Sequence, residues 1–395
     1  MKKHFLQLVI CLLTSTFMSS YAQTYQIGHK SQAFVDASRS NRNITTEIYY
    51  PATTAGDNVT IATGQFPVVV FGHGFVMVWS AYDNIWTGVV PNGYIMVFLT
   101  TETGFSPSHL DFGKDIAFMV GAMKAEGLKA SSTFYGAVTN KSAIMGHSMG
   151  GGSSFLAVQF DSTITAMATL APANTNPSSI TAAKSITIPE IIFSGVNDCV
   201  ATPATNQIPM YDSLASACKT LVNIIGASHC QFANSNTNCS LGDGTCSPKP
   251  TITRAVQQGI VTSLLIPWLN FYLKNDCSSG NQFQSLITAA SGITSQQNCT
   301  LSCTTSVGNI VRNNFLVQVS PNPFNSEATV IIQDAAGKIG NAVFTMYDIY
   351  GRAVKSVTVT STTFKLDRVN LPSGIYFYKV KGDRGQISTG KIVIE

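Results

Sequence analysis

The sequence predicts an α/β domain, with a mostly parallel sheet flanked by helices, followed by a small all-β domain. From about Thr24 to Asp276, apolar runs of strand length alternate with longer segments of helical spacing, an order typical of a parallel sheet with crossover helices. From about Phe315 onwards the apolar runs are short and are separated by turn signals, as in a β-sandwich. A chain of 395 residues has room for one large and one small domain.

The elements of the first domain follow from the spacing of its apolar residues. We expect strands at Phe66–Phe71, Tyr94–Leu99, Ser142–Met145, Glu190–Ser194 and Thr220–Ile225. The apolar spacing of Asp115–Lys124 and of Gln257–Leu273 predicts crossover helices. The domain is therefore expected to span residues 24–276.

Residues 315–395 are expected to form an immunoglobulin-like sandwich. The predicted strands are Ala328–Ile332, Ala342–Tyr347, Val357–Val359, Ile375–Val380 and Lys391–Ile394, with turns at Pro321–Phe324 and Leu371–Gly374. Between the two domains, residues 277–314 are polar and hold three cysteines. We expect a linker there that disulfides hold in place.

The first 22 residues have the pattern of a cleaved signal peptide. Lys2 and Lys3 give a basic start, the stretch from Phe5 to Phe17 is apolar, and Ser20-Tyr21-Ala22 supplies small residues for cleavage. No later stretch stays apolar for the roughly 18 residues that a membrane helix needs. We therefore expect residues 1–22 to be removed and the protein to be exported.

Cysteine usage agrees with export, because an even number in an exported chain predicts disulfides. Of the nine cysteines, Cys11 lies in the leader, and eight remain: Cys199, Cys218, Cys230, Cys239, Cys246, Cys277, Cys299 and Cys303. No C-x-x-C pair or paired histidines accompany them, which disfavours zinc. We expect Cys199–Cys218, across a short return connection, and Cys230 bonded to Cys246 or to Cys239, with Cys199–Cys230 as an alternative.

Composition disfavours other classes of function. Only 11% of the residues are charged, the formal net charge is +4, and lysine and arginine form no cluster. The electrostatic footprint of a nucleic-acid-binding protein is therefore missing. We expect a monomer that uses no cofactor and no bound metal.

Ser148 has the sequence context of a catalytic nucleophile. It lies in Gly146-His147-Ser148-Met149-Gly150, a G-x-S-x-G motif directly after an apolar run. A nucleophile on a tight strand-to-helix turn needs small neighbours so that its hydroxyl can meet a base. The alternative is a glycine-rich turn with an incidental serine.

A base and an acid follow Ser148 in the order that α/β-hydrolases use, Ser, then Asp or Glu, then His. Of the six histidines, only His229 lies downstream of Ser148, in a loop after a predicted strand. Asp198 also follows a predicted strand, where catalytic groups gather in open α/β sheets. Asp161 comes too soon after the nucleophile, and Asp212 falls in a predicted helix. The predicted triad is therefore Ser148, Asp198 and His229.

Two backbone N–H groups are expected to form the oxyanion hole. One is that of Met149, after the nucleophile, and the other is that of Phe75, in Gly72-His73-Gly74-Phe75. The glycines there allow a close approach of the backbone. His73 and His147 are interpreted as structural hydrogen-bonding neighbours, in preference to a metal ligand or a second base.

With these motifs, residues 24–276 resemble the bacterial cutinase and polyester-hydrolase group of α/β-hydrolases, which includes poly(ethylene terephthalate) hydrolases. The matching pieces are the elbow Gly146–Gly152, Phe75, Asp198, His229 and the strand Gly93–Val97. The resemblance implies a serine esterase acting on polyester or cutin-like substrates. It also implies an open groove without a lid insertion, lined in part by Phe75 and Met149.

The sequence departs from that group at one place. Those enzymes usually carry a tryptophan between the strand after the elbow helix and the acid strand, whereas Ala171–Ile188 contains none. His73-Gly74-Phe75 is more similar to chlorophyllase-type esterases and lipases. Hydrolysis of lipid or small esters is therefore an alternative to polyester hydrolysis. A non-catalytic surface-binding protein is a further alternative, against which the complete set of catalytic residue types argues.

The tail resembles the C-terminal sorting domain of the type IX (Por) secretion system. The matching pieces are Pro321-Asn322-Pro323, Tyr347–Arg352, Leu371–Tyr376 and Gly390–Ile394. The resemblance implies passage through the periplasm, contact with outer-membrane secretion machinery, and a secreted or cell-surface product. An adhesion or carbohydrate-binding module is the alternative.

Overall fold

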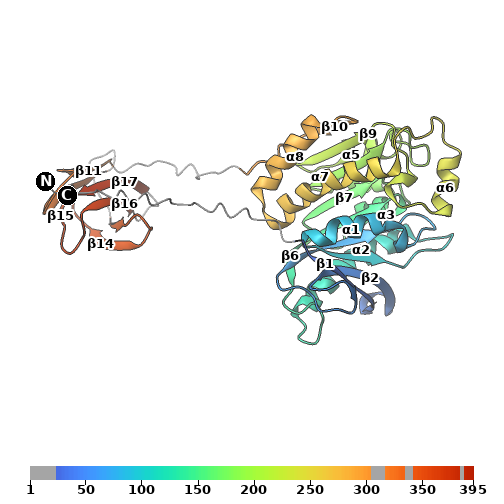
Figure 1. Cartoon of the computed structure of the whole chain (residues 1–395), viewed down its shortest axis with the longest axis horizontal. Helices are drawn as coiled ribbons and strands as arrows, with labels where there is room; N and C mark the ends of the chain where they lie inside the picture. The colour runs from blue at the N-terminus through green and yellow to red at the C-terminus, as the bar shows by residue number, and fades with distance from the viewer. Residues whose placement is uncertain (1–23, 304–315, 334–340, 383–386) are drawn as a thin grey trace, which may run out of the picture. The chain divides into compact units, whose positions relative to one another are not determined.

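A computed structural model describes residues 24–303, 316–333, 341–382 and 387–395. The chain folds into two compact units, Met1–Ser302 and Cys303–Glu395 (Figure 1). The predicted signal peptide, residues 1–22, lies outside the described residues. Among those described, no helix has the length and apolar character needed to cross a membrane.

A ten-stranded sheet forms the centre of the first unit, in the order β10-β9-β8-β7-β6-β4-β5-β2-β1-β3. The strands are β1 Gln26–Asp36, β2 Arg42–Ala52, β3 Gly56–Asp57, β4 Phe66–Gly72, β5 Ile95–Leu99, β6 Val138–His147, β7 Ala166–Leu170, β8 Glu190–Gly195, β9 Lys219–Ile224 and β10 Ile293–Gln297. From β5 through β9 the neighbouring strands are parallel, while β2 and β10 join their neighbours antiparallel. The predicted α/β class with a mostly parallel sheet is confirmed.

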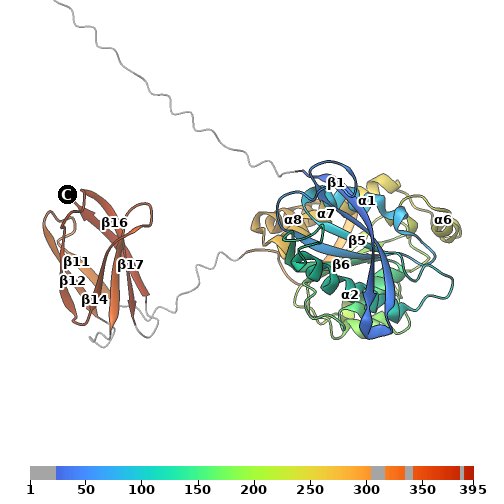
Figure 2. The same ribbon diagram turned by 90° about the horizontal axis from the view of Figure 1, so that it is seen from below.

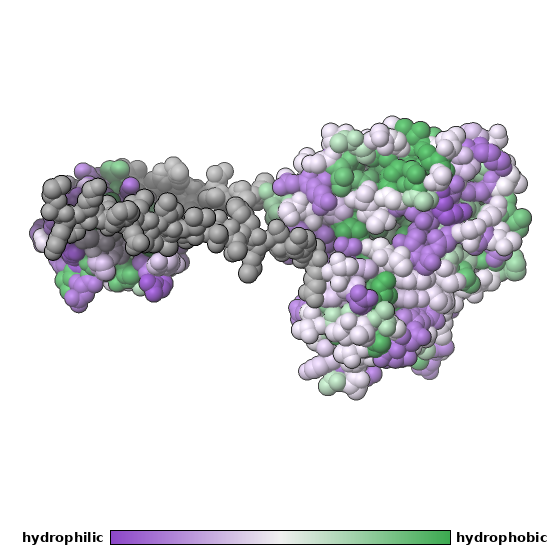
Figure 3. All heavy atoms as spheres, in the orientation of Figure 1, coloured by the Kyte–Doolittle hydropathy of each residue, from purple (hydrophilic) through white to green (hydrophobic). Residues whose placement is uncertain are grey.

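Helices cover both faces of this sheet. They are α1 Asp83–Val89, α2 His109–Leu128, α3 Met149–Ala157, α4 Ser179–Ala183, α5 Gln207–Ser213, α6 Thr237–Gly244, α7 Arg254–Lys274 and α8 Cys277–Ala289, with short 3₁₀ turns at Ala37–Arg39, Trp79–Tyr82, Val90–Asn92 and Cys230–Phe232. Figure 2 shows α2 and α7 on opposite sides. Since side chains alternate along a strand, Val68 and Val70 of β4 pack with α2, and Val69 and Phe71 pack with α7. Apolar side chains also reach the surface over α7 (Figure 3).

Three parts of the first unit differ from the expected layout. Residues 277–297, placed in a linker by the sequence, form α8 and β10, and β10 extends the sheet beside β9. Few apolar residues mark them, because α8 buries mainly Phe283 and Ile287 and β10 is an exposed edge strand. The long antiparallel pair β1 and β2 and the central strand β7 were also not predicted.

The second unit is a sandwich of two antiparallel sheets. One has the order β11-β12-β15 and the other β14-β13-β16-β17. The strands are β11 Leu316–Ser320, β12 Glu327–Gln333, β13 Ala342–Tyr347, β14 Ala353–Val359, β15 Thr363–Asp367, β16 Gly374–Gly382 and β17 Ile387–Ile394. Alternate residues of both sheets, such as Ile332 of β12 and Phe344 of β13, share one core. The predicted small all-β domain is confirmed.

The disulfide pairing corrects the sequence-based prediction. Cys199 bonds to Cys246, Cys218 to Cys299, and Cys230 to Cys239, and Cys277 and Cys303 are disulfide-bonded as well. The expected Cys199–Cys218 and Cys230–Cys246 bonds are therefore wrong, as is the alternative Cys199–Cys230, whereas the alternative Cys230–Cys239 is confirmed. The reason is topological. Cys199 follows the carboxyl end of β8, whereas Cys218 precedes the amino end of the parallel neighbour β9, so the two lie at opposite edges of the sheet.

Candidate active site

Ser148 lies on a sharp turn between β6 and α3. Its backbone has φ 54° and ψ −117°, a strained conformation of the kind that holds a nucleophile exposed above a sheet. The N–H of Ser148 donates to Leu170 O at 3.0 Å, so the neighbouring strand β7 fixes the turn. A Cβ on Gly150 would lie 2.1 Å from Gly72 O, so only glycine lets α3 approach β4 this closely. The motif's small residues are thus required by packing.

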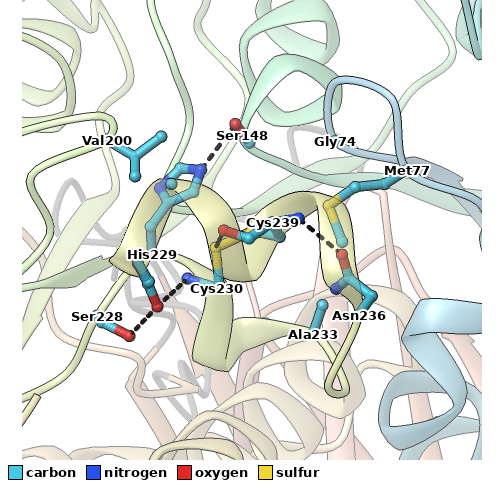
Figure 4. Close-up of a disulfide and its surroundings, with 12 residues drawn as sticks. Gly74, Met77, Ser148, Val200, Ser228, His229, Cys230, Ala233, Asn236 and Cys239 are labelled. Carbon is cyan, nitrogen blue, oxygen red and sulfur yellow. Dashed lines mark hydrogen bonds between the residues drawn. A yellow bond between two sulfur atoms is a disulfide. The ribbon is translucent and has the colours of Figure 1, made fainter. Parts of the chain in front are cut away.

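The structure brings Ser148, His229 and Asp198 into one hydrogen-bonded line. Asp198 follows β8 and His229 follows β9, so both stand at the carboxyl edge of the parallel strands. His229 Nε2 lies 2.8 Å from Ser148 Oγ (Figure 4), and His229 Nδ1 lies 2.7 Å from Asp198 Oδ2. Because a carboxylate only accepts, Nδ1 carries the proton and Nε2 is free to take the hydroxyl proton of Ser148. The arrangement can therefore activate the serine oxygen.

Local backbone groups hold the acid in place. Asp198 Oδ1 accepts hydrogen bonds from the N–H groups of Val200 and Ala201, each at 2.8 Å, which leaves Oδ2 for the imidazole. The side chains of Asp198 and His229 are almost fully buried, so water competes little for either group. Asp161, one of the two acids considered as alternatives to Asp198, accepts instead from the N–H and the hydroxyl of Thr163, two residues further along the chain.

Phe75 and Met149 each offer a backbone donor. Met149 is the first residue of α3, and Phe75 lies in the loop after β4. Neither N–H has an acceptor within the described part of the chain. The two side chains differ, since Phe75 is 49% exposed and Met149 only 3%. Met149 packs into the core beside α2, so its side chain does not line the surface in the way the sequence implied.

Two buried histidines flank the triad without joining it. The ring nitrogens of His73 lie 2.8 Å from Gly74 O and 2.7 Å from Thr101 O, beneath the Phe75 loop. His147 contacts Tyr82 through Nδ1 at 2.9 Å and the carbonyl oxygen of His229 through Nε2 at 3.1 Å. Burial, and then the nearby His229, hold the pKa of His147 well below its ordinary value. His147 is therefore neutral.

Sequence reasoning missed Tyr82. This buried side chain lies in the 3₁₀ turn Trp79–Tyr82, where its hydroxyl lies between Gly74 and His147. No motif marks it, because its partners are far away along the chain.

A second missed feature is the segment 236–246, which contains α6 and lies beside the base loop. One disulfide ties it to Cys199, next to Asp198. The other, shown in Figure 4, ties it to Cys230, next to His229. The family resemblance implied a site without a lid insertion, and it did not mark this segment, which the disulfides hold against the loops that carry Asp198 and His229. Its only sequence signal was the position of two cysteines directly after the predicted acid and base.

No group of metal-ligating side chains suited to an ion occurs within the described ranges. Residues 19–248 match the family model described as PET hydrolase-like. Residues 318–395 match the model described as secretion system C-terminal sorting domain. A search of curated proteins found no match for the chain. The tail is thus a type IX sorting domain, which directs the chain to secretion or the cell surface and engages the type IX machinery.

Proposed function

Because the chain belongs to the PET hydrolase-like family, a group of ester-hydrolysing enzymes, we propose that it is an exported serine carboxylic-ester hydrolase. The observation that carries the proposal is the line Asp198–His229–Ser148, with contacts of 2.7 and 2.8 Å at the carboxyl edge of the sheet. A serine, a base and a buried acid in this order supply each group that acyl transfer needs.

The reaction proceeds in two halves. His229 Nε2 takes the proton of Ser148 as Oγ attacks the ester carbonyl carbon, and the carbonyl electron pair moves onto oxygen. The N–H groups of Phe75 and Met149 stabilise that oxyanion. Collapse breaks the bond to the alcohol, which leaves with the proton from His229. Water then gives a proton to His229 and attacks the acyl-serine, which releases the carboxylic acid and restores Ser148.

For the substrate, we propose polyester or cutin-like esters. The apolar side chains of Phe75, Val200 and Leu241 support this choice, since they are 49%, 48% and 71% exposed around the catalytic loops. An extended apolar chain can lie on such side chains while its ester reaches Ser148. The second candidate is a lipase-like or chlorophyllase-like esterase, which the absence of a tryptophan from Ala171–Ile188 favours.

The triad is tested with Ser148→Ala, assayed on short- and medium-chain nitrophenyl esters. We expect loss of nearly all activity, because the hydroxyl is the attacking group. Ser153→Ala is the matched control, since Ser153 is a buried serine on α3, the helix that begins directly after Ser148, and its hydroxyl has no partner in the described residues; it should keep wild-type activity. Near wild-type turnover in Ser148→Ala would refute the proposal and favour a non-catalytic binding protein with a contaminating esterase.

The substrate class is tested by incubating the protein with a polyester film and, separately, with a triglyceride emulsion. Release of soluble aromatic acids from the film supports polyester hydrolysis. Strong release of fatty acids with no product from the film would replace it with the lipase alternative. Ser148→Ala is the blank for both.

A further inference from the structure

Gly74, which precedes the proposed oxyanion donor Phe75, packs directly against two buried side chains. Its N–H donates to Tyr82 Oη at 2.8 Å. A Cβ on Gly74 would lie 3.2 Å from both Tyr82 Oη and His147 Nδ1, and 2.7 Å from Met77 Sδ. No larger residue fits without moving these atoms. The loop that carries Gly74 and Phe75, called the oxyanion loop below, therefore packs against the Tyr82–His147 pair.

The hydrogen bonds of this pair run in one direction. The carbonyl oxygen of His229 can only accept, so His147 Nε2, 3.1 Å away, donates to it. The neutral ring then accepts at Nδ1, and the hydroxyl of Tyr82, at 2.9 Å, donates to it. The oxygen of Tyr82 in turn accepts the N–H of Gly74. This chain of three bonds joins Gly74 to the backbone of His229, and both intervening side chains are fully buried.

The chain fixes the two ends that catalysis uses. Gly74 C=O belongs to the same peptide unit as Phe75 N–H, and it accepts from Met77 N–H at 3.0 Å. Because Tyr82 accepts the N–H of Gly74, the peptide groups on both sides of Gly74 are held by hydrogen bonds. The direction of the Phe75 N–H is fixed with them. At the other end, the ring of His147 lies 4.8 Å from that of His229. A donor that is oriented in advance costs no reorganisation during the reaction.

We propose that Tyr82 and His147 are positioning residues, which hold the oxyanion loop in register with the loop of the catalytic base. This inference rests on the proposed function, because it assigns roles to Phe75 and His229. Within the described residues, neither Tyr82 nor His147 forms a hydrogen bond with Ser148 Oγ. They act through the backbone of Gly74 and of His229.

The test is Tyr82→Phe, which removes one hydroxyl and keeps the ring. A misdirected donor weakens transition-state binding alone, so kcat should fall by about tenfold or more, against the roughly 10²–10³-fold cost of deleting a whole oxyanion donor. KM should change less than about twofold. Tyr94→Phe is the matched control, because Tyr94 is another buried tyrosine with one hydrogen bond, to Asn270, at the amino edge of the sheet.

Rates are expressed per active site titrated with a fluorophosphonate, which loses fluoride to the serine hydroxyl, so that unfolded protein is not counted. A merely structural Tyr82 would lower the melting temperature of Tyr82→Phe and leave kcat per titrated site at the Tyr94→Phe level. That result would overturn the inference.

A second arm uses His147. In His147→Phe both hydrogen bonds are lost, whereas His147→Gln keeps a donor and an acceptor and should restore part of kcat. If the three hydrogen bonds act as a unit, the double variant Tyr82→Phe with His147→Phe should lose no more kcat than the worse of the two single variants. Multiplied losses would contradict the inference. If the triad assignment itself is wrong, a different result follows: Ser148→Ala would still hydrolyse the ester, and the fluorophosphonate would not label Ser148 in the wild-type protein.

Discussion

Asn238, on α6, donates a 2.7 Å hydrogen bond to the carbonyl oxygen of Val76, in the loop that follows β4. Val76 has a φ of 54°, which is rare for a β-branched residue and persists only where surrounding contacts hold it. Since Cys239 and Cys246 tie the same segment to the base and acid loops, one short stretch of chain contacts all three loops of the candidate site. The segment therefore holds the site together from outside.

Two of the disulfides are expected to contribute differently, Cys218–Cys299 mainly to the stability of the fold and Cys230–Cys239 mainly to catalysis. Cys230–Cys239 closes a separation of 9 residues and Cys218–Cys299 one of 81, so the longer closure should stabilise the fold by about 2 kcal/mol more in the chain-entropy view. Cys230→Ser with Cys239→Ser should instead lower kcat more, because that bond adjoins His229. Melting temperature and kcat are measured for both double variants. Parallel losses in the two would contradict the assignment.

Asp198→Asn should leave the fold intact and lower kcat by about 10⁴. An amide that donates to His229 Nδ1 forces the proton onto Nε2, which then cannot accept from Ser148. Turnover is compared with that of Asp212→Asn. This variant is the control, because Asp212 was excluded as the catalytic acid from its place in a predicted helix. A loss below tenfold in Asp198→Asn would remove Asp198 from the triad.

Glu190 should destabilise the protein as the pH rises. Its carboxyl group is buried at the start of β8, Thr169 donates to Oε1 at 3.0 Å, and Oε2 has no partner among the described residues. Burial raises its pKa well above the ordinary 4.5. Folding therefore takes up a proton above pH 4.5, and stability falls by up to about 1.4 kcal/mol per pH unit until the folded pKa is reached.

Glu190→Gln cannot ionise, so its melting temperature should exceed that of wild type at pH 7 to 9 and converge with it near pH 4.5. Thermal unfolding across this range measures the difference. Equal melting temperatures at all pH values would show that the carboxyl group ionises freely in the folded state.

The buried histidines should have the opposite effect. Burial lowers the pKa of His73, and burial with the nearby His229 lowers the pKa of His147 well below 6.5. Their stability contribution is present above about pH 6.5, the unfolded value, and is lost as the pH falls below it, because the unfolded chain then binds more protons. Urea midpoints between pH 8 and 5 should decline. The decline should be shallower in His147→Gln, and an unchanged slope in that variant would rule out a contribution from His147.

Much of the fold was predictable because its signals are local. The apolar runs that became β4, β5, β6, β8 and β9 are buried on both faces of a parallel sheet, and such strands read as nearly continuous hydrophobic segments. The edge strand β10 and helix α8 bury few residues, so their sequence looks like a polar linker. Strand β1 mixes exposed, partly buried and buried positions without a continuous apolar run, and its pairing with β2 decides its place.

The candidate site also contains residues that local sequence signals could identify and one residue that they could not. Ser148, Asp198 and His229 could be named because chain order and strand ends restrict where a nucleophile, an acid and a base can stand, and their catalytic roles stay proposals. Tyr82 could not be named, since its hydroxyl gains its role only from Gly74 and His147, which other elements supply.

By itself the sequence determined that this is a large α/β domain with an exported, β-rich tail, and where the candidate nucleophile Ser148 stands. Tertiary structure alone decided which cysteines meet, how segment 236–246 joins the loops of the candidate site, and which buried side chains contact Gly74 beside Phe75. The physical reason is distance along the chain. Burial patterns and turn residues act over a few positions, whereas the partner of a thiol or a hydroxyl depends on which ends of separate strands the sheet brings together.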